Sequence, residues 1–216
     1  MDWRDLLFIL LVVAASALVW AYVMRGKKRQ DRFSQIWREF AELKSLKELP
    51  SDKYRDNEAV IITFQGKNQG MPFVLECVAT EGTPMQVGSL RLSRGEDTRI
   101  FTRMQIMLPG LPRGLRVYRE TQWSKLGKAV GMQDIITGDP EFDRAFMVKG
   151  NDVTAVNNYL TSSRRMVLLA RALSMDGLEL QEQGLTIFKQ GQMETAQELE
   201  EHFSQLGSVA AELVRS

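Results

Sequence analysis

The sequence predicts an α+β protein with a single N-terminal transmembrane helix, then an antiparallel-sheet-rich domain with helices in its C-terminal half. Three observations predict this. Residues 6–24 carry no charge, the hydrophobic period becomes two from about residue 58, and helix caps recur from about residue 152. The chain has 216 residues and a formal net charge of +1, and the part beyond residue 58 is long enough for one hydrophobic core.

The run from Leu6 to Met24 is 19 residues long. As a helix it would span about 28 Å, close to the roughly 30 Å hydrocarbon core of a bilayer. Trp3 lies before the run, and Trp20 and Tyr22 lie near its end, where aromatic rings favour the headgroup layer. A cleaved signal peptide would carry its positive charge ahead of a shorter apolar stretch. A buried core helix is the other alternative. We expect neither of these, but a retained transmembrane anchor over residues 1–24.

Basic residues follow the run directly, at Arg25, Lys27, Lys28 and Arg29. The positive-inside rule then places residues 25 onward in the cytoplasm, with the inverted topology as the alternative. The same four side chains are candidates for contact with anionic lipid headgroups. They lack the interleaved aromatic residues of a nucleic-acid surface, so we expect no nucleic-acid partner.

Residues 25–57 form the predicted connection between anchor and domain. An amphipathic helix over about residues 33–49, ended by Pro50, is indicated by apolar residues three and four apart, at Phe33, Ile36, Trp37, Phe40, Leu43 and Leu46. This stripe could pack on the domain, lie on the membrane, or pair with another copy of the chain. Residues 51–57 are expected to be a charged linker.

The first half of the predicted domain, residues 58–216, consists of close-set strands. Strands are expected at residues 59–65, 72–80, 87–92, 99–108 and 115–120, with a hairpin turn at residues 66–70 and a break at residues 109–112. Strands without intervening helices favour an antiparallel meander. Phe73, Leu75 and Cys77 fall on one face, so we expect Cys77 to be a core residue and not a reactive thiol.

The second half alternates between strands and helices. Residues 142–148 are predicted to form a strand, Asp152 to cap a helix reaching about Leu160, and Ser162 or Ser163 to cap a helix with Met166, Leu169, Ala170 and Leu173 along one stripe. A hairpin is expected over residues 178–189. Thr195 and Glu198 have capping-box spacing, and they precede a helix whose apolar stripe contains Leu199, Phe203, Leu206, Ala210 and Leu213.

The composition excludes several kinds of site. One cysteine and one histidine leave no disulfide framework, multi-cysteine zinc site or histidine cluster. Glycine-rich phosphate loops, a GxSxG elbow and an HExxH motif are also absent from the sequence. His202 borders the apolar stripe of the last helix, where a boundary residue is expected and not a catalytic base. We therefore predict a non-enzymatic chain without catalytic, cofactor-binding or metal-binding residues.

The densest acidic patch contains Asp134, Asp139, Glu141 and Asp143, with Arg144 beside them. Carboxylates grouped in this way can bind a hard cation or divide acid and base roles. However, the spacing of a calcium-binding loop is missing, and Asp139 before Pro140 is typical of a turn. The structural interpretation is favoured over a metal site or catalysis.

The same stretch carries a family resemblance. Residues 134–143 (DIITGDPEFD), residues 146–150 (FMVKG), and the later Tyr159-Leu-Thr and Arg164-Arg165 are similar to a bacterial family of membrane-anchored domains of unknown function. Members share a GDPxFDxxFxVxG segment, and the similarity covers roughly residues 58–190. It implies a bacterial inner-membrane location and no particular activity. Phe142, Asp143 and Phe146 match the segment, and we assign them to folding.

These observations predict a membrane-tethered cytoplasmic interaction or scaffold domain. The alternative is a domain that binds a lipid or small ligand at the membrane surface. Two apolar stripes, residues 33–46 and 199–213, are the candidate surfaces for a protein partner or for self-association.

Overall fold

The structure is a computed structural model that describes residue 20 and residues 31–50, 58–80, 85–87, 90–92, 99–119, 133–172 and 174–216. The chain divides into two compact units, Met1–Glu39 and Phe40–Ser216. Most of the predicted anchor and the basic cluster at residues 25–29 lie outside the described residues. Among the residues described, no helix has both the length and the apolar composition required to cross a bilayer.

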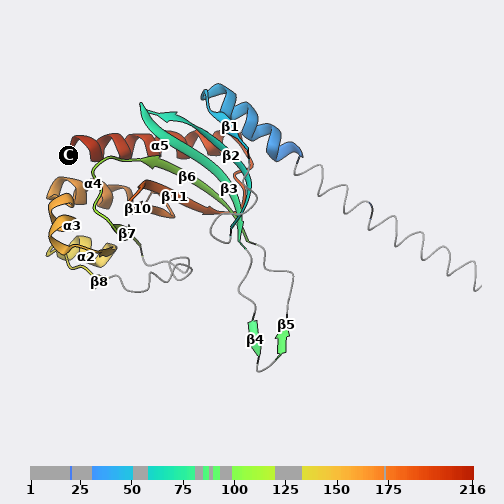
Figure 1. Ribbon diagram of the computed structural model, residues 1–216. Coiled ribbons are helices and arrows are strands. Elements are labelled where there is room, and N and C mark those ends of the chain that lie inside the picture. Colours follow the sequence, from blue (N-terminus) through green and yellow to red (C-terminus); the bar gives the residue numbers. More distant parts are fainter. Residues whose placement is uncertain are drawn as a thin grey trace, which may run out of the picture. The chain divides into compact units, whose positions relative to one another are not determined.

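Within the described part of the second unit, nine strands form one antiparallel sheet in the order β1-β2-β3-β6-β11-β10-β7-β9-β8 (Figure 1). The strands are β1 (Lys47–Leu49), β2 (Glu58–Asn68), β3 (Met71–Thr80), β6 (Arg99–Met107), β7 (Arg116–Tyr118), β8 (Gln133–Asp134), β9 (Met147–Gly150), β10 (Leu178–Gln181) and β11 (Gly184–Gln190). A separate hairpin pairs β4 (Met85–Val87) with β5 (Leu90–Leu92), where the sequence predicted a single strand. The α+β class and the antiparallel sheet are confirmed.

The first hairpin, β2–β3, is tighter than the sequence predicted. Gln69 and Gly70 form its turn, and both have positive φ angles, 52° and 80°. Two central residues with positive φ are the mark of a type I′ turn, whose twist matches that of the strands. Gly66, expected in the turn, instead pairs with Phe73 within the ladder.

The predicted meander is correct only for β2, β3 and β6. The β10–β11 hairpin lies between β6 and β7, so the sheet is completed by residues from the C-terminal third of the chain. Seven consecutive residues of β11 pair with β6, and Leu185 and Ile187 bury their side chains opposite Ile106 and Met104. β7 has three residues and could not cover the nine residues of β6.

Helices follow in the C-terminal half, as predicted. They are α2 (Pro140–Ala145), α3 (Val153–Tyr159), α4 (Ser162–Ala172) and α5 (Ala196–Arg215). The caps predicted at Asp152 and Thr195 are confirmed, since their side chains accept hydrogen bonds from the amides of Ala155 and Glu198. At the start of α4, the hydroxyl of Thr161 accepts a hydrogen bond from the Arg164 amide. The cap is therefore Thr161 and not Ser162 or Ser163, the two residues predicted for it.

Two predictions in this half are wrong. Residues 142–148 are not one strand, because α2 occupies residues 140–145 and β9 starts at Met147. The stripe predicted for α4 is also misplaced, since Leu168 is buried whereas Met166 is 62% exposed. Packing against α2 and α5 selects the buried face of α4, and the sequence of a short helix does not specify that choice.

Helix α5 covers one face of the sheet. Its apolar stripe, Leu199 to Leu213, lies on one face of the helix as predicted. The stripe is buried within the domain, so its use as a surface for a protein partner, which the sequence suggested, is wrong. The ring of Phe203 packs edge-on against Phe73 of β3, with centroids 4.8 Å apart. Leu75 and Cys77 lie on the same face as Phe73, and all three side chains are inaccessible to solvent. This confirms the shared face predicted from the alternation of β3.

The segment before the sheet differs from its prediction after Leu43. Residues 31–43 are helical, and residues 47–49 are β1 instead of the last turn of that helix. Ser45 adopts φ 55°, and the Leu46 amide donates to the Ala41 carbonyl at 2.7 Å. These are the features of a Schellman motif, which ends a helix without needing proline. Residues 40–49 are part of the second compact unit, and the predicted linker at residues 51–57 lies outside the described residues.

The end of this helix packs on α5. The ring centroids of Phe40 and Phe203 are 5.7 Å apart, and Lys44 Nζ forms an ion pair with Glu200 at 2.7 Å. Phe40 and Leu46 are buried, whereas Leu43 is 79% exposed and lies off the buried stripe. The C-terminal end of the apolar stripe at residues 33–46 therefore packs on the domain, which is one of the three uses considered for it.

Candidate functional site

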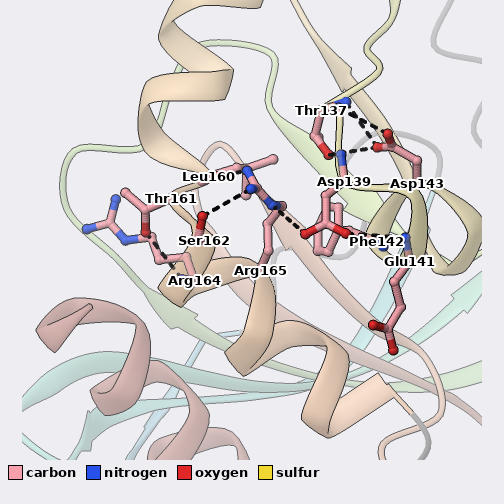
Figure 2. A network of polar contacts seen from close by, with 11 residues as sticks. Thr137, Asp139, Glu141, Phe142, Asp143, Leu160, Thr161, Ser162, Arg164 and Arg165 are labelled. Carbon is pink, nitrogen blue, oxygen red and sulfur yellow. Dashed lines mark hydrogen bonds and ion pairs between the residues drawn. The ribbon is translucent and has the colours of Figure 1, made fainter.

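The acidic segment found in the sequence folds into a polar network that joins α2, α3 and α4 (Figure 2). It starts at Asp139, the N-cap of α2. One carboxylate oxygen, Oδ1, accepts hydrogen bonds from the amides of Glu141 and Phe142, both at 3.2 Å. Pro140 occupies the first turn, where its missing N–H costs no hydrogen bond. The Asp-Pro pair therefore starts a helix, where the sequence suggested a simple turn.

Asp143 closes the loop that precedes α2. Its Oδ1 accepts from the Thr137 amide at 3.0 Å and from the Thr137 hydroxyl at 2.8 Å, and its Oδ2 accepts from the Gly138 amide at 3.1 Å. Gly138 has φ 80°, a conformation that favours glycine. The carboxylate thus fixes the backbone of the motif.

Arg165 of α4 connects the network to the end of α3. Its Nε donates to Asp139 Oδ2 at 3.1 Å, and its Nη1 donates to the Leu160 carbonyl at 2.6 Å. The third nitrogen, Nη2, lies 3.3 Å from Ser162 Oγ. The Phe142 amide, together with Arg165 and the Glu141 amide, holds the pKa of Asp139 below its ordinary value.

Arg164 makes a parallel set of contacts on the other side of α4. Its Nη1 donates to the Tyr159 carbonyl at 2.9 Å, and its Nε donates to the Leu213 carbonyl in α5 at 3.2 Å. The guanidinium lies 4.2 Å from the centre of the Tyr159 ring. Burial raises the pKa of Tyr159. The two adjacent arginines therefore satisfy carbonyls at the end of α3 and connect that end to α2 and α5.

The aromatic residues of the motif are buried beneath this network. The rings of Phe142 and Phe146 have centroids 4.9 Å apart, and both side chains are buried. Glu141 is exposed, and its side chain points away from the other carboxylates in Figure 2. The network therefore brings together Asp139 and Asp143 of the predicted patch, but not Glu141.

The chemistry available to this network is limited. Asp139 and Asp143 accept hydrogen bonds from amides, a hydroxyl and a guanidinium, and these bonds use the oxygens that would otherwise coordinate a cation. No three His, Cys, Asp or Glu side chains of the described residues lie close enough together to hold a metal ion. The side chain of Asp134 lies outside that description.

Two other residues were singled out in the sequence. Cys77 is buried in the sheet, and burial raises the pKa of its thiol to about 12. His202 is half-buried on α5, where its Nδ1 lies 2.9 Å from the Glu198 carbonyl oxygen. Burial, assisted by the positive charge of Lys189, lowers the pKa of His202. Both locations agree with the structural roles expected for these residues.

Sequence reasoning missed a charged group on the sheet face opposite α5. Glu76 of β3 is buried and directly opposite Arg103 of β6, whose Nε donates to Glu76 Oε2 at 2.8 Å. Thr63 of β2 lies next in the same row, with its hydroxyl 3.4 Å from Glu76 Oε1. A glutamate inside an apolar strand was the available signal, but its partner depends on strand register.

The comparisons add no relative to this description. No family model matches the chain, and neither a curated protein nor a solved structure matches it. The resemblance to a bacterial membrane-anchored family therefore stays a prediction based on the residues of the motif.

Proposed function

We propose that the chain is a single-pass membrane protein whose α+β domain is a non-catalytic interaction or scaffold module at the cytoplasmic face of a bacterial inner membrane. The observation that carries the membrane part is the 19-residue uncharged run at residues 6–24, followed by Arg25, Lys27, Lys28 and Arg29. The proposal also includes contact between these four basic residues and anionic lipid headgroups.

The interaction role is supported by how the domain uses its polar side chains. Asp139, Asp143, Arg164 and Arg165 hold backbone and side-chain partners within the domain. A group engaged in this way is less available to bind substrate or transfer a proton than one held in an open cleft. A domain built around such a network suits a scaffold, whose task is to present a surface.

Membrane extraction and topology reporters test the first part. Alkaline carbonate should leave the full chain in the membrane pellet, and a cytoplasm-only reporter fused after Ser216 should be active. A silent reporter in cells that express the protein normally would show that the topology is inverted.

Replacing Arg25, Lys27, Lys28 and Arg29 with Gln should weaken or invert insertion of the predicted anchor, because those charges set its orientation. Detection of hydrolase or transferase turnover by the purified chain would contradict the non-catalytic role.

A second candidate is binding of a lipid or small ligand on the sheet face opposite α5. Thr186 of β11 is 1% exposed, and its hydroxyl has no hydrogen-bond partner among the described residues. Buried polar atoms generally have partners, so a bound polar group is one way to satisfy this hydroxyl. Thermal-shift screening of the full chain against lipid headgroups and small polar compounds tests this candidate. A stabilising compound should lose its effect in Thr186→Val.

A further inference from the structure

Two buried polar atoms on the sheet face opposite α5 lack a hydrogen-bond partner among the described residues. They are the hydroxyl oxygen of Thr186 in β11 and Nε of Arg116 in β7. An unpaired buried polar atom costs free energy, and such atoms are hydrogen-bonded in most proteins. Two of them close together need a group that the described part of the domain does not supply.

The strand register brings both atoms beside Glu179 of β10. Thr186 is directly opposite Glu179, and the side chains of such a pair lie about 5 Å apart. From the other side, Arg116 Nη2 donates to Glu179 Oε2 at 3.3 Å. Leu180 pairs with Leu185, and both are buried on the α5 side, so alternation places Glu179 and Thr186 on the other face. The Glu179 cluster, made of Arg116, Glu179 and Thr186, thus spans three adjacent strands (Figure 1).

Glu179 supplies this cluster with an unused acceptor. Arg116 and Gln181 both donate to Oε2, the latter at 2.8 Å, and within the described structure Oε1 has no hydrogen-bond partner. The side chains of Arg116 and Glu179 are 24% and 17% exposed, whereas Thr186 is 1% exposed. Solvent therefore reaches the cluster at the ion pair and is excluded at the hydroxyl.

Charge and hydrogen-bonding capacity decide which ligand matches the cluster. Arg116 and Glu179 neutralise each other, and Lys149, opposite Arg116 on β9, has an interaction partner of its own. A charged ligand would be attracted by one member of the pair, repelled by the other, and stripped of its hydration. The unused groups are a donor at Arg116 Nε, an acceptor at Glu179 Oε1, and the Thr186 hydroxyl, which does both. Neighbouring hydroxyl groups match this set, because each of them also donates and accepts.

We propose that the Glu179 cluster binds an uncharged ligand with neighbouring hydroxyl groups, a sugar or a polyol. One ligand hydroxyl accepts from Arg116 Nε, its neighbour donates to Glu179 Oε1, and the Thr186 hydroxyl bonds to one of the two. The inference rests on the second candidate function, binding on this sheet face, and specifies its ligand. A free sugar and the sugar headgroup of a lipid offer the same chemistry.

Two variants at position 186 isolate the hydroxyl, since Thr186→Ser keeps it and Thr186→Val removes it. Glucose is titrated calorimetrically into the full chain in phosphatidylcholine nanodiscs. Thr186→Ser should bind within about twofold of the unsubstituted chain, and Thr186→Val should bind about tenfold more weakly, because a ligand hydroxyl loses its partner. Gln190→Ala, at the exposed end of β11, is the control and should bind as the unsubstituted chain does.

The melting temperature without glucose shows whether the Thr186 hydroxyl is structural. If the hydroxyl is unpaired in the free chain, Thr186→Val should melt no lower than the unsubstituted chain, because it removes a buried polar group without a partner. A lower melting temperature would mean that the hydroxyl has a partner within the chain, and it would overturn the inference.

Charge and source of the ligand form the remaining arms. Glucuronate and glucosamine have the ring of glucose with a negative and a positive charge, and neither should bind more tightly than glucose. Tighter binding of either one, with the same dependence on Thr186, would overturn the inference and leave the second candidate function intact. Absence of binding by all three would contradict both. Nanodiscs with a glucosyl diacylglycerol separate the sources, because a lipid ligand raises the melting temperature without free glucose, and Thr186→Val should lose that rise.

Discussion

Asn68, the last residue of β2, donates a hydrogen bond from Nδ2 to the carbonyl oxygen of Phe203 at 2.6 Å. The two residues are 135 positions apart in the chain. Asn68 is buried, and Phe203 lies in the middle of the apolar stripe of α5. A buried amide that reaches a helix carbonyl fixes where the helix crosses the sheet, because an alternative crossing would leave the amide unpaired.

The same contact makes Gly207 a sensitive position. A Cβ on Gly207 would fall against the side chain of Asn68, within 2.9 Å of its Cγ. Gly207→Ala should therefore destabilise the domain by about 1–3 kcal/mol through overpacking, although alanine favours helix by about 1 kcal/mol. Urea unfolding followed by circular dichroism measures the change. Ser208→Ala on the same helix is the matched control, and an increase in stability for Gly207→Ala would contradict the packing.

Replacement of Arg165 by lysine is expected to lower the free energy of unfolding of the domain. Its planar group reaches Asp139, Leu160 and Ser162 at once, and a single ammonium cannot reproduce that fork. Loss of the charged hydrogen bond to the Leu160 carbonyl alone should cost about 1.5–3 kcal/mol. Arg144→Lys, at an exposed position of α2, is the control, and its unfolding midpoint is expected to change little. Equal unfolding midpoints for the two variants would show that the hydrogen bonds of Arg165 do not stabilise the domain.

Replacement of Asp139 separates its two roles. Asp139→Asn keeps an N-cap oxygen but loses the charge that faces Arg165, whereas Asp139→Ala loses both. The melting temperature should therefore fall more for Asp139→Ala than for Asp139→Asn. Glu141→Gln, which changes an exposed neighbour, should be close to the unsubstituted chain. The reverse order of Asp139→Asn and Asp139→Ala would show that the cap is unimportant.

The lowered pKa of Asp139 predicts a pH dependence. A carboxyl whose pKa is lower in the folded state contributes stability above its unfolded value of about 3.9. That contribution is lost as the pH falls through the folded value. The difference in melting temperature between the unsubstituted chain and Asp139→Asn should thus be full at pH 6 and should shrink below pH 4. A difference that does not change with pH would exclude the charge as its cause.

Cys77 provides a built-in probe of unfolding. Its thiol is buried and has a pKa of about 12, so it is protonated at pH 8 and unreactive. Iodoacetamide should modify the native chain very slowly and the urea-unfolded chain rapidly. Leu43→Cys, at a position that is 79% exposed, should react quickly in the native state. Rapid native modification at Cys77 would mean that the sheet opens locally around β3.

The parts of the fold that were predicted correctly depend on local patterns. Alternation identified the buried face of β3, and capping residues located the starts of α3 and α5. The error at residues 142–148 came from reading Phe142 and Phe146 as one strand face. These residues are four apart, which also suits one turn of helix, and the Asp139–Pro140 cap decides in favour of the helix.

The remaining features depend on contacts between distant residues. The insertion of β10–β11 beside β6 and the pairing of Arg165 with Asp139 join segments that no local spacing relates. The end of the helix at Leu43 was missed for a different reason. Its left-handed residue is Ser45, and serine gives no signal comparable to glycine at that position.

The position of β11 also determines when the domain can form during synthesis. The centre of the sheet, where β6 meets β11, requires residues 184–190, and β7, which pairs with β9 on its other side, is joined to this centre only through β10. Strands β1, β2, β3 and β6 therefore emerge as a four-stranded fragment in which the edge of β6 still lacks its partner β11, and an unpaired strand edge is prone to aggregation. If the proposed anchor is inserted first, this incomplete sheet is tethered to the membrane until the C-terminal third of the chain has been synthesised.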